Sequence, residues 1–339
     1  MAKVARFVLA GALLLGVISL GNPARADDTR VPRLPSELPL PRLPAPFVLP
    51  ELSHPRLDAR IDWIVGRMSP QNSARPSSTI ALARVSGETS IFFPRKLYVG
   101  FVLPYGAALP PDGAVPPGYE GEVRPSGIRS ALGNLEAQIR AVFAMPTFLE
   151  YGFLLGVVAP TARFDRNFAP NRSATEAAAS VEPTDFVHFL PGRVALRPAG
   201  DLRILRRSFV FQARQGIDIM IDGKGIERAR AAGRLLLHLG YLARPDLELS
   251  IEATQIYFFF SDDKVTTANG ERLTVGQAIE SQYRINDDRR TAITVGPGLR
   301  YALRHFDVGG AIVTNLVGPL ASAGDGFVAL RLSLIAHVP

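Results

Sequence analysis

Ten charged residues occupy alternate positions within otherwise apolar segments of the chain, and they are the main candidates for functional chemistry. Alternate side chains of a β-strand point to the same face, so these charges would share one side of a sheet. Fixed charges along an aqueous passage select among small ions, and an arginine-rich constriction favours anions. Six of the ten are arginine, and the full set is Glu136, Arg140, Arg214, Asp218, Arg234, Glu248, Glu252, Arg300, Arg304 and Arg331. An equally weighted alternative is a hydrated, salt-bridged wall with no ion preference.

Other kinds of chemistry find little support in the sequence. The absence of cysteine excludes disulfides, thiolate metal sites and cysteine nucleophiles. The five histidines show no spacing that requires a metal ion, and the GKG at 223–225 lacks the rest of a phosphate-binding loop. A hydrolytic pair of Ser250 and His238 on an outer wall is disfavoured, because both fall on the polar phase of their segments. We therefore predict no catalytic residue, no metal site and no cofactor.

The candidate residues belong to segments in which apolar residues recur at every second position, a pattern typical of β-strands. Many segments run to about 10 residues or more, whereas strands of globular proteins cluster near five or six. The longest, 202–221, could split into two. The eleven expected strands are 79–85, 96–105, 130–145, 148–159, 186–196, 202–221, 233–244, 246–260, 291–304, 308–316 and 327–338.

Each of these segments has an apolar face that lipid or another protein layer must cover. The alternation by itself also allows a soluble two-layer sandwich. Three features favour lipid: the strand length approaches the ~9–11 residues that span a bilayer, the polar faces are mixed, and aromatic residues gather near segment ends as in an interfacial girdle. The aromatic residues concerned are Phe92, Phe93, Tyr98, Tyr105, Phe186, Phe189, Tyr257, Phe258, Phe259 and Phe260.

Strands in hydrocarbon must pair every backbone amide, which requires a closed barrel without edges. Because bacterial single-chain barrels have even strand numbers, we predict an all-β, closed antiparallel transmembrane β-barrel of 12 strands, within a range of 10–14. Pro297 lies inside one expected strand and cannot donate a ladder hydrogen bond, so we expect it at a bulge or a rim. The barrel is expected to cover residues 79–339.

The first 78 residues differ in composition from the rest. Residues 1–26 carry Lys3 and Arg6, an apolar run and a small-x-small end, which predicts a secretory signal peptide cleaved after Ala26. Residues 27–78 form an expected proline-rich arm, with eight prolines from Pro32 to Pro55. Within it, the spacing of Leu57, Ile61, Ile64 and Val65 predicts one short amphipathic helix over 57–68.

The formal net charge is +7, and removing the three basic residues of the signal peptide leaves 38 − 3 = 35 basic against 31 acidic residues. A basic excess can indicate nucleic-acid binding. Because an exported protein seldom meets nucleic acid, we predict no such partner.

Two stretches resemble a known class of protein. Residues 149–167, LEYGFLLGVVAPTARFDRN, resemble a strand that ends in a Pro-Thr turn, and residues 293–320, ITVGPGLRYALRHFDVGGAIVTNLVGPL, resemble a glycine-proline-glycine strand with its following hairpin. The resemblance is to bacterial outer-membrane β-barrel channels, in particular the transporter barrels associated with phenol- and aromatic-degradation operons. It implies a location in the cell outer membrane and passage of small solutes.

We therefore expect an outer-membrane channel or passive transporter for small solutes, either anion-preferring or for small hydrophobic compounds. Its partners would be outer-membrane lipid and small solutes, with periplasmic or peptidoglycan partners at the N-terminal arm. Two other classes stay open. One is a structural barrel whose arm anchors cell-envelope partners, and the other is a soluble periplasmic β-protein.

Overall fold

The computed structural model describes residues 57–69, 78–91, 97–109, 129–145, 149–162, 182–190, 193–222, 225–259, 291–303, 305–317 and 326–338. The expected signal peptide and most of the expected proline-rich arm lie outside these residues. The described residues contain one 3₁₀ helix, η1 (Pro183–Phe189), and thirteen strands: β1 (Leu57–Ser69), β2 (Ser78–Ser90), β3 (Leu97–Leu109), β4 (Arg129–Leu132), β5 (Glu136–Met145), β6 (Leu149–Val158), β7 (Arg193–Arg206), β8 (Phe209–Asp222), β9 (Gly225–Arg244), β10 (Leu247–Phe258), β11 (Thr291–Ala302), β12 (Phe306–Val317) and β13 (Gly326–Val338).

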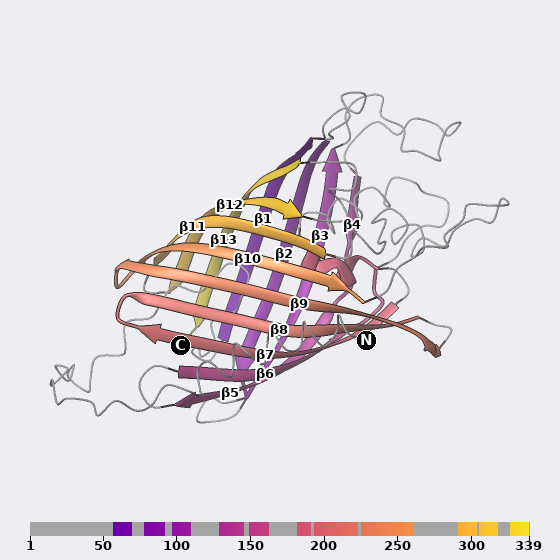
Figure 1. The fold of residues 1–339 in the computed structure, drawn as a ribbon, viewed down its shortest axis with the longest axis horizontal. Helices are drawn as coiled ribbons and strands as arrows, with labels where there is room; N and C mark the ends of the chain where they lie inside the picture. Colours follow the sequence, from indigo (N-terminus) through magenta and orange to yellow (C-terminus); the bar gives the residue numbers. More distant parts are fainter. Residues whose placement is uncertain are drawn as a thin grey trace. The chain divides into compact units, whose positions relative to one another are not determined.

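The strands form one antiparallel sheet that closes on itself, with β5–β10 crossing in front of β1–β3 in Figure 1. Strand β1 pairs with β2 on one side and with β13 on the other, which joins the two ends of the sheet. The short β4 and the longer β5 pair with the same side of β3, at residues 105–108 and 97–102, so they are two parts of one barrel strand. The barrel therefore has twelve strands, as predicted.

The connections at the two ends of the barrel differ in length. Two-residue turns at 207–208 and 245–246 join β7 to β8 and β9 to β10, and the start of β1 and the end of β13 lie at this short-turn end. At the opposite, long-connection end, β3 leads to β4, β6 to β7, and β10 to β11 through much longer stretches of chain. This asymmetry is typical of outer-membrane barrels, whose turns are short on the periplasmic side.

The predicted helix over 57–68 is wrong, because these residues form strand β1 and the barrel begins at Leu57 rather than at residue 79. Trp63 and Val65 point outward with 41% and 51% of their surface exposed, while Arg60 and Asp62 point inward and are buried. Ile64 also points inward and is 3% exposed. This one apolar residue on the inner face created the helix-like spacing of the sequence.

The predicted strand over 186–196 is also wrong in its first half. Residues 183–189 form η1, and β7 begins only at Arg193. The predicted strand over 202–221 splits at residues 207–208 into the end of β7 and all of β8, where Arg207 adopts a positive φ of 54°. No helix among the described residues has the length and hydropathy needed to cross a membrane.

Prolines within the strands coincide with interruptions in the hydrogen-bond ladder. The pairing of β11 with β12 passes from Val295 to Gly298 without a change of register and omits Pro297, so this proline lies at a gap in the ladder inside the strand rather than at the predicted bulge or rim. The pairing of β7 with β8 likewise omits Pro198, and Pro104 on β3 faces the break between β4 and β5. Each proline thus lies where no donor is required of its nitrogen.

The two faces of the sheet have opposite character. Large apolar side chains on the outer face are strongly exposed, including Phe153 at 62%, Ile251 at 56% and Ile312 at 56%. The inner face carries most of the buried charged side chains. A closed barrel with an apolar exterior and a charged interior is the reverse of a soluble sandwich, and it matches the lipid-facing arrangement predicted from the sequence.

Only part of the predicted aromatic girdle lies on the outer face. Tyr105 is 43% exposed, but Tyr98, Phe186, Phe189 and Phe258 are at most 1% exposed. The outward aromatic residues include two groups beside short turns. Phe143, Tyr151 and Phe153 form one, and Phe209 and Tyr241, whose ring centroids are 5.3 Å apart, form the other.

Candidate functional site: the barrel interior

The barrel interior contains nine of the ten charged residues predicted to line it. Their exposed fractions range from 0% to 8%, and they come from six different strands: Glu136 and Arg140 on β5, Arg214 and Asp218 on β8, Arg234 on β9, Glu248 and Glu252 on β10, Arg300 on β11 and Arg331 on β13. Arg304 lies outside the described residues.

Sequence reasoning missed several interior charges, most of them acidic. Among the described residues, ten acids and seven arginines are buried, so the arginine majority of the predicted set does not extend to the whole interior. Most of the missed charges lie at inward positions of β1, β2 and β7, so recognising these strands and their phase would have found them. The missed residues are Arg60, Asp62, Glu88, Glu182, Asp185, Arg197, Asp201 and Asp307.

Helix η1 lies inside the barrel, near the long-connection end. Its buried residues Phe186, Val187 and Phe189 belong to an apolar cluster with side chains from ten strands, β1, β2 and β6–β13. The rings of Phe186 and of Phe258 on β10 meet edge to face, with centroids 5.2 Å apart. A segment surrounded by apolar residues from nearly every strand is enclosed by the barrel wall. Helix η1 therefore fills part of the cross-section of the barrel interior near this end.

Asn134, in the break between β4 and β5, fixes η1 to the wall. Its Nδ2 donates to the carbonyl oxygens of Val187 (3.3 Å) and Leu190 (2.6 Å), and its Oδ1 accepts from the Ala162 amide at 2.8 Å. The backbone amide of Asn134 also donates to the His188 carbonyl at 2.6 Å. The break in the strand therefore frees backbone and side-chain groups that bind both ends of the β6–β7 connection.

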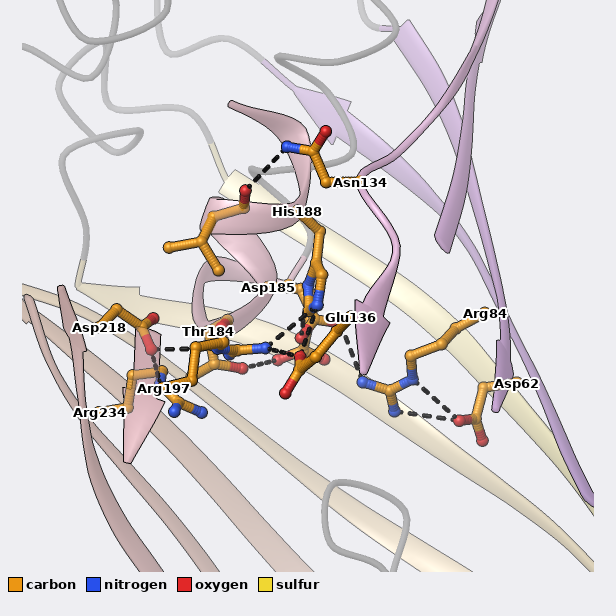
Figure 2. A network of polar contacts seen from close by, with 12 residues as sticks. Asp62, Arg84, Asn134, Glu136, Thr184, Asp185, His188, Arg197, Asp218 and Arg234 are labelled. Atoms are coloured by element: carbon orange, nitrogen blue, oxygen red, sulfur yellow. Dashed lines mark hydrogen bonds and ion pairs between the residues drawn. The ribbon is translucent and has the colours of Figure 1, made fainter. Parts of the chain in front are cut away.

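The polar side of η1 contacts strands β2, β5 and β7 of the barrel wall, as Figure 2 shows. Asp185 accepts from Arg84 on β2 at 2.9 Å, and His188 Nε2 lies 2.8 Å from Glu136 Oε2 on β5. From β7, Arg197 donates to the Thr184 carbonyl at 2.8 Å and to Glu136 at 2.5 Å. The charged groups therefore lock η1 in place in addition to its apolar contacts.

Further ion pairs continue around the inner wall. Arg84 also binds Asp62 at 3.0 Å, and Arg197 and Arg234 both meet Asp218 Oδ1, at 3.0 and 2.5 Å. Other pairs are Arg140 with Glu88, Arg214 with Asp201, Arg331 with Glu182, and His238 with Glu248 and Glu252. Pairing of this kind offsets the cost of burying each charge.

A cavity of about 90 Å³ remains beside the polar side of η1. Five arginines line it (Arg60, Arg84, Arg197, Arg214 and Arg234), against three acids (Glu136, Glu182 and Asp185). The space beside η1 therefore has a local excess of positive charge, although acids outnumber arginines among the described buried residues.

Among the described residues of the interior, neither a metal site nor a hydrogen-bonded Ser250–His238 pair is present. No group of three histidine or acidic side chains within the described ranges is arranged to hold a metal ion. Ser250 and His238 are buried on the inner face, as predicted, and both ring nitrogens of His238 face the carboxylates of Glu248 and Glu252 at 2.9 Å.

Comparisons with known proteins identify the fold. No protein-family model and no curated protein matches this sequence. Among solved structures, an outer-membrane channel from Pseudomonas putida F1 matches with a TM-score of 0.57 and 12% identity, over 86% of this chain and 99% of that one. The KdgM porin (TM-score 0.42, 7% identity, 83% and 99% coverage) and the NanC porin (0.43, 8%, 82% and 100%) are less similar. The chain thus has the β-barrel fold of bacterial outer-membrane proteins.

Proposed function

We propose that this protein is an outer-membrane channel for small solutes, whose passage is narrowed by η1. The observation that carries the proposal is the closed twelve-strand barrel with its exposed apolar wall and its interior of buried charged side chains. Such an interior offers polar solutes a hydrated route through the membrane, whereas the hydrocarbon core of the bilayer excludes them. The placement of η1 at the long-connection end would put the constriction near the extracellular mouth.

One observation favours the second candidate, a structural barrel. The charged side chains described inside the barrel are almost fully buried, so in this arrangement they contact one another rather than a wide water-filled path. A barrel that never opens would act as an anchor for other envelope components. The third candidate, a soluble periplasmic protein, fits poorly with an apolar wall exposed on so many strands.

Flux measurements distinguish the first two candidates. We expect purified protein in liposomes to let small sugars or salts through, and in planar bilayers to give small conductance steps. Because five arginines face three acids at the cavity beside η1, we expect the reversal potential in a KCl gradient to show anion preference. A folded barrel without flux would support the anchor, and cation preference would contradict the assignment of selectivity to this cavity.

The conductance is also expected to depend on pH through His188. Burial and the neighbouring Arg197 lower the pKa of His188, but the adjacent carboxylates of Asp185 and Glu136 outweigh them, and the net pKa is raised above 6.5. Protonated His188 therefore stabilises the docked η1 below pH 6.5, and this stabilisation is lost as the pH rises through the raised pKa.

We expect bilayer conductance to increase toward alkaline pH and the step to disappear in the His188→Gln variant, which cannot take up a proton. The control is Arg244→Gln at the exposed end of β9, beside the β9–β10 turn, which should keep the wild-type pH profile. An alkaline rise that persists unchanged in His188→Gln would assign the step to another group.

A further inference from the structure

Arg234 on β9 is incompletely satisfied in the barrel interior. It is 4% exposed, its Nε lies 2.5 Å from Asp218 Oδ1, and its Nη2 has no hydrogen-bond acceptor among the described residues. Other arginines at the same cavity are held by two or more bonds to acids: Arg84 by Asp62 and Asp185, and Arg214 by Asp201. A buried donor without an acceptor is costly, and this donor borders a cavity with room for one.

The wall beside Arg234 is shaped to leave this space. Gly216 on the neighbouring β8 has no side chain, and a Cβ built there would lie 3.1 Å from Arg234 Nη2 and 2.8 Å from the Pro198 carbonyl oxygen. Any larger residue at 216 would crowd the guanidinium. In Figure 2 the Arg234 guanidinium extends from β9 below Arg197, and its only contact drawn is to Asp218.

The cavity has two kinds of lining. Arg197 and Arg234 supply positive charge, and the side chains of Val102, Leu154 and Leu236 supply apolar surface. A guanidinium presents a planar pair of donors that matches a carboxylate. The volume of about 90 Å³ suits a molecule of only a few heavy atoms.

We propose that this cavity is a binding site for a small organic carboxylate, of about two to four carbons. The carboxylate accepts hydrogen bonds from the Nη edge of Arg234, and the short alkyl group lies toward Leu154 and Leu236. The inference deepens the proposed channel function, because it names the solute class that would pause at the constriction beside η1.

Binding is tested on the full-length protein in detergent micelles, by calorimetric titration with sodium propionate at constant ionic strength. We expect saturable binding, a loss of about tenfold or more in affinity for Arg234→Gln, and wild-type affinity for the surface control Arg244→Gln. Ser86→Leu adds volume at the cavity and leaves every charge in place, so it should also weaken binding. Heat-modifiable gel migration verifies that each variant is folded. If Arg234→Gln fails to fold, the propionate affinity of Ser86→Leu tests whether the cavity is the binding site.

Absence of saturable binding to the wild type, or equal affinity in folded Arg234→Gln, would overturn the site. The same preparations are then measured in planar bilayers with KCl alone. Chloride conductance without propionate binding overturns the carboxylate site and leaves the channel standing. Propionate binding without any conductance supports the site and overturns the channel.

Discussion

Replacing Asn134 by alanine is expected to raise the bilayer conductance several-fold, because this side chain holds η1 inside the barrel. The substitution removes the two hydrogen bonds to the Val187 and Leu190 carbonyls and the one from the Ala162 amide. Leaving such buried groups unsatisfied costs about 1–3 kcal/mol each. A total loss of about 3 kcal/mol would raise the fraction of undocked η1 by roughly a hundredfold.

The matched variant Asn134→Asp separates the roles of the two ends of the side chain. Aspartate keeps an oxygen that accepts from the Ala162 amide but loses the donor to η1, so most of the conductance increase should remain. The measurement is single-channel recording of folded, heat-modifiable protein. Unchanged conductance in folded Asn134→Ala would show that η1 is not the constriction, or that Asn134 does not hold it.

The repeated alternation of apolar and polar residues, together with the length of the segments, was the main basis for predicting the barrel. It identified charged inner-face residues on β5 and β8–β10, since strands facing lipid on one side and charge on the other follow a period of two. The rule failed where the inner face is apolar. Ile64 on β1 is the example, because it packs in the cluster around η1 and broke the polar phase of that strand.

The site was predictable only as a list of inward charges. Which of them meet depends on register across the barrel and on η1, and neither follows from local pattern. Phe186 and Phe189 were predicted to lie in a strand and in the aromatic girdle. The reason is that apolar residues separated by polar ones give the same short pattern in a lipid-facing strand and in a short helix. Contacts such as Asp185 with Arg84, 101 residues apart in the chain, have no local signal.

The largest effect on assembly is expected from a charge on the outer wall. Leu332 on β13 is 46% exposed, and it pairs with Trp63 on the neighbouring strand β1. The next outward residues along β13, Leu330 and Leu334, are 49% and 37% exposed. An arginine deep in the lipid-facing band of such a barrel costs about 2–4 kcal/mol. A Leu332→Arg substitution should therefore reduce the folded-to-unfolded ratio in lipid vesicles by roughly 30-fold or more.

The same substitution distinguishes lipid from water as the solvent of this wall. On a water-exposed surface, replacing leucine by arginine changes stability by only about 0.5 kcal/mol or less. The control Leu332→Ala removes the apolar side chain without adding charge, and should cost much less than Leu332→Arg. Urea titrations of vesicle-inserted protein, followed by gel migration, measure both variants. Near-equal midpoints for Leu332→Arg and the wild type would mean that water covers this face, and a transmembrane barrel would then be untenable, because its apolar wall must be in contact with acyl chains.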